Sequence, residues 1–147
     1  MQPLRWLIPF LAIGLLAAPA AAQNPEIALV EKASGKVTVL RDGHPLRLRA
    51  GDPLYQKDVV ETGPDGSVGI TFNDNTVFST GPNSQLALDQ FQFDPGTAHG
   101  AMLAELRKGT LSVVSGEIPH GSPGAMKIKT PNAVLGVRGT TFAVRVY

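Results

Sequence analysis

The stretch that decides the fold lies near the end of the chain, where Val137-Arg138-Gly139-Thr140 leads into Thr141-Phe142-Ala143-Val144. A glycine-containing turn that carries one arginine passes directly into residues whose polarity alternates. Alternation with a period of two is typical of a strand with one buried face. This stretch therefore predicts a turn followed by a strand, and it has no catalytic spacing.

The same alternation recurs upstream. Alternating runs occur at residues 36–39, 86–88, 91–93, 111–113, 127–129 and 142–146. Groups of Gly, Pro, Asn and Asp separate them, and these residues favour chain reversals because they supply a positive φ, a fixed φ or an Asx turn. The groups are residues 42–43, 51–53, 63–66, 73–75, 81–83, 94–96 and 121–124. Reversals at this spacing predict an all-β sandwich, barrel or solenoid in a single domain.

One window, residues 98–107, has some helical character. Gly100 and the adjoining Lys108-Gly109 pair weaken that interpretation, because glycine is unfavourable inside a helix. We therefore expect a strand over residues 102–107 that ends at Lys108-Gly109. Residues 94–100 and 118–124 are expected to be the loosest segments.

Residues 1–22 have the pattern of a signal peptide. Arg5 precedes an apolar run, and Ala20-Ala21-Ala22 supplies a small-residue cleavage site, so the mature chain is expected to be residues 23–147. The alternative is an uncleaved membrane anchor, but the run is short for a span and is interrupted by Pro9 and Gly14. We expect an exported protein with no membrane span after cleavage. The periplasm is the first expectation for its compartment, and a secreted or surface-associated protein is the alternative. The absence of Cys excludes disulfides and thiolate metal sites.

The charge balance argues against a nucleic-acid partner. The chain has 13 Lys and Arg against 12 Asp and Glu, and loss of Arg5 with the signal peptide leaves the mature chain formally neutral. Basic residues do gather locally, and the simplest interpretation is that they lie on solvated strand faces. The two groups are Arg41, Arg47 and Arg49, and Lys127, Lys129, Arg138 and Arg145.

Patterns typical of enzymes and metal sites are missing from the sequence. His44, His99 and His120 are scattered, without the spacing of a zinc motif. The segment Asn73-Asp74-Asn75 lacks the Gly and bidentate Glu of an EF-hand loop, so we interpret it as a hairpin turn. The carboxylates that a glycosidase would need mostly adjoin turns. They are Asp52, Asp58, Glu61, Asp65, Asp74, Asp89 and Glu105. We expect no catalytic residues, no cofactor and no bound metal.

Taken in order, the turn motifs resemble the FecR-type domain family over residues 30–147. The motifs are Gly35 with Val37 and Val39, Gly51-Asp52-Pro53-Leu54, Thr62-Gly63, Asp65-Gly66-Ser67, Asn73-Asp74-Asn75-Thr76, Gly81-Pro82-Asn83-Ser84, Lys108-Gly109 before Leu111, Thr130-Pro131, and Val137-Arg138-Gly139-Thr140 with Phe142. The chain departs from the family at Asn75, where Gly is common. Asn tolerates left-handed backbone angles, so the turn is still expected.

The resemblance implies a non-enzymatic module of the bacterial envelope with a short β-solenoid-like or flattened double-sheet β-sandwich fold. The best-known members resemble regulators of iron uptake, in which a cytoplasmic segment controls a sigma factor and a periplasmic part senses a receptor. The sequence shows no such cytoplasmic segment, so we carry over only the extracytoplasmic module. We expect it to bind another envelope protein through residues 94–100 and 118–124 and a free sheet edge. The alternatives are a cell-wall or glycan-binding module and, third, a polysaccharide hydrolase.

The motif residues are expected to be structural. They are Gly51, Asp52, Thr62, Gly63, Gly66, Thr130, Pro131, Arg138, Gly139, Thr140 and Phe142. For Arg138 we expect hydrogen bonds to carbonyls of neighbouring turns that lock the last strand; the alternative is contact with a partner's carboxylate. The phenylalanines at alternating strand positions are expected in the core. They are Phe72, Phe78, Phe91, Phe93 and Phe142.

Overall fold

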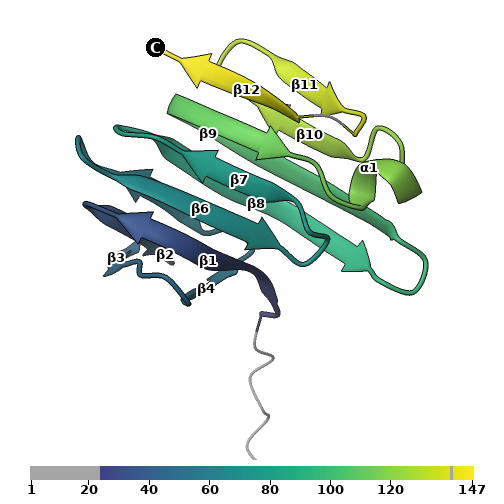
Figure 1. Ribbon diagram of the computed structural model, residues 1–147, viewed down its shortest axis with the longest axis horizontal. Coiled ribbons are helices and arrows are strands. Elements are labelled where there is room, and N and C mark those ends of the chain that lie inside the picture. The colour runs from purple at the N-terminus through teal and green to yellow at the C-terminus, as the bar shows by residue number, and fades with distance from the viewer. Residues whose placement is uncertain (1–23, 140) are drawn as a thin grey trace, which may run out of the picture.

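Twelve strands and one short helix make up the part of the chain that the computed structural model describes, residues 24–139 and 141–147 (Figure 1). The elements are β1 (Glu26–Ser34), β2 (Val37–Arg41), β3 (His44–Arg47), β4 (Pro53–Tyr55), β5 (Val59–Thr62), β6 (Ser67–Phe72), β7 (Val77–Thr80), β8 (Gln85–Asp94), β9 (His99–Val114), α1 (Ile118–Gly121), β10 (Met126–Lys129), β11 (Val134–Val137) and β12 (Thr141–Val146). The predicted signal peptide and Thr140 lie outside the described residues.

The strands form two sheets that share β9. Sheet A has the order β4-β1-β6-β7-β9-β12, and sheet B has the order β3-β2-β5-β8-β9-β10-β11. All pairs are antiparallel except β9 with β10. In Figure 1, β11 and β12 lie at one end of the molecule, and β3 and β4 lie at the other. The sheets therefore leave four edge strands.

Gly109 is the point at which β9 passes from one sheet to the other. The residues before it pair with β8 and β10 in sheet B, and residues 109–114 pair with β12 in sheet A. Gly109 has a φ of +90°, and a side chain there would collide with Ser84 in the turn between β7 and β8. Glycine alone combines that backbone angle with that close approach.

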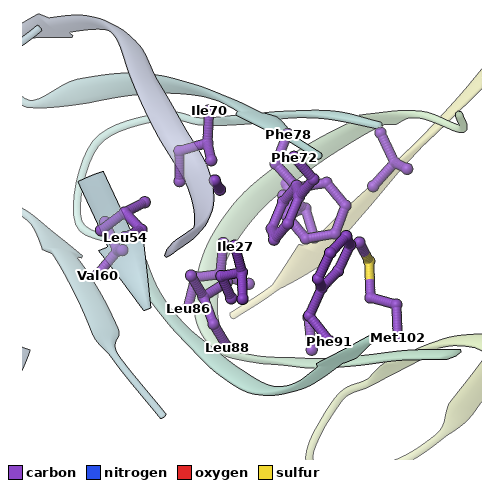
Figure 2. Close-up of a cluster of buried hydrophobic side chains, with 14 of the residues drawn as sticks. Ile27, Leu54, Val60, Ile70, Phe72, Phe78, Leu86, Leu88, Phe91 and Met102 are labelled. Carbon is purple, nitrogen blue, oxygen red and sulfur yellow. The ribbon is translucent and has the colours of Figure 1, made fainter. Parts of the chain in front are cut away.

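One hydrophobic cluster fills the space between the sheets. Ile70 from sheet A and Leu86 from sheet B are both fully buried in it. At one end of the cluster the rings of Phe72 and Phe78 meet edge-on at 4.8 Å, and Phe72 lies 5.3 Å from Phe91 of the opposite sheet (Figure 2). These aromatic contacts join the two sheets directly.

The structure confirms the all-β prediction, and the antiparallel pairing matches its double-sheet form. Residues 102–107 are a strand, as predicted, within β9. Asn75 has a φ of +67°, so it adopts the left-handed conformation expected of it. Phe72, Phe78 and Phe91 are buried in the core, whereas Phe93 and Phe142 are only partly buried against it.

Two local predictions are wrong. The strand does not end at Lys108-Gly109, because the positive φ of Gly109 bends β9 without reversing it and the strand continues to Val114. Residues 118–124 are not a loose loop, since they contain α1 and Ile118 is fully buried. Burial of Ile118 and Pro119 helps to hold this segment against the sheets. The predicted loop at 94–100 reduces to a hairpin, because Asp94 already pairs with His99.

Candidate functional site

The Thr62 motif joins three turns. The Thr62 hydroxyl donates to the carbonyl of Gly81 at 2.7 Å and accepts from the amide of Ser84 at 2.9 Å. Gly63 donates its amide to the Lys36 carbonyl at 2.9 Å. A side chain at Gly66 would collide with that same carbonyl. Thr62 and its glycines therefore use their polar groups inside the fold.

The Gly51-Asp52 motif fastens a turn to β1. Asp52 accepts the amide of Arg49 at 2.8 Å, which closes the turn. The amide of Gly51 donates to the carbonyl of Val30 at 2.7 Å, and the amide of Val30 donates to the carbonyl of Asp52 at 2.9 Å. These bonds meet β1 where its pairing with β6 shifts register between Val30 and Lys32. The motif thus continues the pairing of β1 beyond its last registered pair with β4, Leu29 with Pro53.

The closing motifs lie at the β11–β12 end of the molecule. Thr130 begins the β10–β11 turn beside Pro131, and its hydroxyl accepts the amide of Ala133 at 3.1 Å. Gly139 has a φ of +85° and lies beside the imidazole of His120 on α1. Phe142 is half-buried at the start of β12.

Arg138 does not make the predicted hydrogen bonds to any described residue. Its side chain is exposed, and no hydrogen bond or ion pair joins it to another described residue. The expected lock on turn carbonyls is therefore missing from residues 24–139 and 141–147. An exposed guanidinium is available to a partner's carboxylate, which is the alternative that the sequence left open.

We expect Arg138→Ala to leave the thermal stability almost unchanged, within about 0.5 kcal/mol, because an exposed side chain with no bonded partner among the described residues contributes little to folding. Thermal unfolding followed by circular dichroism measures this. A loss of several kcal/mol would restore the structural role. Arg41→Ala serves as the comparison that is expected to be destabilising.

Asp74 has a role that sequence reasoning missed. Its carboxylate is fully buried and accepts the Thr76 hydroxyl at 2.7 Å, the Thr76 amide at 3.1 Å and the Ile118 amide at 3.2 Å. Its main-chain carbonyl accepts the amide of Glu117 at 2.9 Å. The β6–β7 turn therefore holds the beginning of α1. An Asx-turn pattern at 74–76 was a visible signal, but the contact with Ile118 was not.

A second polar cluster surrounds Arg41 and Asp58. The guanidinium of Arg41 binds both carboxylate oxygens of Asp58, at 3.0 and 2.7 Å, and lies 4.6 Å from the centre of the Tyr55 ring. The hydrogen bond to Asp58 is the main reason that the pKa of Arg41 is raised above its ordinary value. Asp58 is 1% exposed and also accepts the amide of Tyr55 at 2.9 Å.

A hollow of about 330 Å³ adjoins this cluster, and Asp42, Gln56 and Lys57 contribute to its lining. It is lined by polar groups around a half-buried tyrosine.

The three histidines are exposed and lie apart from one another, at the start of β3, at the start of β9 and in α1. Within the described residues no three His, Asp or Glu side chains gather as a metal site. No helix in that part of the chain is long and apolar enough to cross a membrane.

The four edge strands differ in how they are protected. β3 contains Pro45, β4 has three residues and begins with Pro53, and β11 has four residues and contains Gly136. Short strands, proline and interior glycine all discourage the addition of another strand. β12 has six residues without Pro or Gly. It is the edge best suited to pair with a further strand.

A protein-family model described as FecR protein matches residues 58–147. This range begins at the buried Asp58 and runs through β12. No curated protein and no solved structure matches the chain.

Proposed function

Because the chain belongs to the FecR protein family, we propose that it is an exported, non-enzymatic module that binds another protein of the bacterial envelope. The observation that carries this proposal is the set of exposed sheet edges at the two ends of the molecule. Unpaired main-chain N–H and C=O groups on such edges bind extended segments of other proteins. The fold thus supports binding through the backbone of an edge.

The internal use of the family motifs supports the same role. Thr62, Asp52 and Asp74 direct their polar atoms into hydrogen bonds within the fold. The polar groups of these motifs therefore hold the turns in place, and the turns in turn fix the positions of the edge strands. Membership of this family supports a regulatory role in envelope signalling, with the periplasm as the proposed compartment. The partner senses or transmits a signal through this module.

A second candidate function is binding of a cell-wall glycan. The observation in its favour is the hollow beside Tyr55, where an aromatic ring adjoins Arg41, Asp42 and Lys57. Sugars bind on aromatic faces flanked by hydrogen-bonding groups. In this hollow, however, Arg41 is already stacked over the ring and bound to Asp58, which leaves less of the ring for a sugar.

The two functions are separated by parallel capture experiments with the purified protein. We expect it to retain the same envelope protein in repeated captures from a detergent-solubilised envelope fraction, and heat-unfolded protein to retain none. We expect no co-sedimentation with isolated peptidoglycan. Co-sedimentation that is abolished by Tyr55→Ala, without any reproducible protein partner, would contradict the proposal and favour glycan binding.

A further inference from the structure

β12 has a strand partner on one side only. Its register with β9 runs from Val146 beside Gly109 to Phe142 beside Val113, and no other described strand pairs with residues 142–146. The strand carries valine, phenylalanine and threonine, which favour β structure. An unprotected edge of this composition attracts another strand unless something covers it.

The apolar row of β12 is incompletely covered. On the neighbouring strand, Leu111 and Val113 are fully buried. On β12 the side chains in the same row, Phe142, Val144 and Val146, pack against the core but stay half-exposed. Burial therefore falls off at the last strand, as expected where one more strand is needed to cover the row. Such a strand would place apolar side chains over it.

The same end of the molecule is basic. Residues 95–147, which form β9 to β12 and α1, contain six Lys and Arg but only Glu105 and Glu117 as acids. Glu105 already faces Arg107 at 3.4 Å. Arg138 precedes β12 and Arg145 lies within it, near its C-terminal end. Both are exposed, and neither has an acidic partner among the described residues. The uncompensated charge beside this edge is positive.

Small side chains leave room on the outer face next to β12. A hollow of about 480 Å³ lies over β7, β9 and β12, and Ser79, Ser112 and Ala143 are among the residues that line it. Arg145 borders the same hollow. Outward side chains of an added strand would lie beside Ala143 and Arg145, at the β12 border of this hollow, and therefore close to a guanidinium.

We propose that β12 accepts an extended, acidic segment of another protein as an additional strand of sheet A. Its inward residues are apolar and cover Phe142, Val144 and Val146, while its outward residues are carboxylates that face Arg145. This inference rests on the proposed function and specifies the edge and the chemistry of the partner. A second copy of the chain fits less well, because pairing two β12 edges would bring Arg138 and Arg145 of both copies together.

Synthetic peptides test the proposal with the purified protein. The probe is a short fluorescent peptide of alternating valine and glutamate. One control has lysine in place of glutamate, and another has the same composition with the valines and glutamates in separate blocks. We expect only the alternating acidic peptide to raise the fluorescence anisotropy and to protect the amides of β12 from hydrogen exchange. Binding should weaken with salt, because charge contributes to it.

Two variants separate the contributions of charge and shape. Arg145→Glu should lower the affinity for the acidic peptide by about tenfold or more and should allow the lysine peptide to bind. The matched control Arg47→Glu on the β3 edge should leave the binding of both peptides unchanged. Val144→Lys should prevent the binding of both peptides, because an inward-pointing charge on an edge strand opposes pairing with another strand. Unchanged circular dichroism of Arg145→Glu, an exposed position, verifies folding.

Several results would overturn the proposal: equal binding of the three peptides, protection of amides outside β12, no protection at any peptide concentration, or concentration-dependent dimerisation through β12. If the protein still captures an envelope partner and Arg145→Glu leaves that capture unchanged, this inference fails while the proposed function stands. If no envelope protein is captured at all, the proposed function itself fails.

Discussion

Asp74→Ala is expected to lower the free energy of unfolding by about 3 kcal/mol or more. The carboxylate is fully buried and accepts hydrogen bonds from the Thr76 hydroxyl, the Thr76 amide and the Ile118 amide. Alanine would leave these donors without their acceptor in a place that water does not reach, and each such loss costs on the order of 1–3 kcal/mol. Urea unfolding followed by circular dichroism measures the change.

Asn73→Ala is the matched control in the same turn. Asn73 is exposed, and its side chain makes one hydrogen bond, to the carbonyl of Glu26 at 2.8 Å. We expect a loss below about 1 kcal/mol, as for a single hydrogen bond near solvent. If Asp74→Ala costs no more than Asn73→Ala, Asp74 does not hold α1 against the β6–β7 turn.

Phe78→Ala is expected to cost about 3–5 kcal/mol, the range for removing a buried aromatic ring and leaving a cavity. Phe78 has no exposed surface, and its ring packs edge-on against Phe72 at 4.8 Å (Figure 2). Phe72 in turn contacts Phe91 of the other sheet. The substitution therefore weakens the contact between the sheets as well as the burial of β7.

Phe93→Ala gives the comparison for this second prediction. Phe93 lies on β8 near its hairpin and is only partly buried against the core. Its loss should be clearly smaller, since less apolar surface is returned to water. Equal losses for Phe78 and Phe93, measured by the same urea titration, would mean that the aromatic contact is not a centre of the core.

Features set by local chemistry were predictable from the sequence. Alternation located strand residues in β2, β8, β9, β10 and β12, and Asp42-Gly43 gave a two-residue hairpin turn in which both residues have positive φ. Asn75 took the left-handed conformation because its side chain tolerates it. Each of these outcomes depends on a few neighbouring residues, so the sequence contains the information directly.

Features that depend on distant residues were not predictable. Asp74 bonds to Ile118, 44 positions away, and Arg41 bonds to Asp58, 17 positions away. The glycine at position 109 gave a turn signal, but the strand continued because Gly109 meets Ser84 at the corner between the sheets. A single sequence does not reveal such contacts, since they arise only when the strands assemble.

The free sheet edge was predictable in kind but not in place. The sequence indicated a free edge and two loops, yet α1 and the β8–β9 hairpin occupy most of those loops and bury Ile118. The edge itself became specific only from the comparison of β12 with β3, β4 and β11. Arg138, expected to lock the fold, instead stands exposed beside β12.

Site-specific photocrosslinking in cells tests the central claim most directly. A crosslinking amino acid replaces Ala143, an exposed position on β12, or Leu46, which is 46% exposed on β3, and the adducts are identified by mass spectrometry. We expect position 143 to capture one envelope protein through an acidic extended segment, and position 46 not to capture it. Adducts with glycan alone, or no protein adduct from either edge, would contradict a protein-binding role for this module.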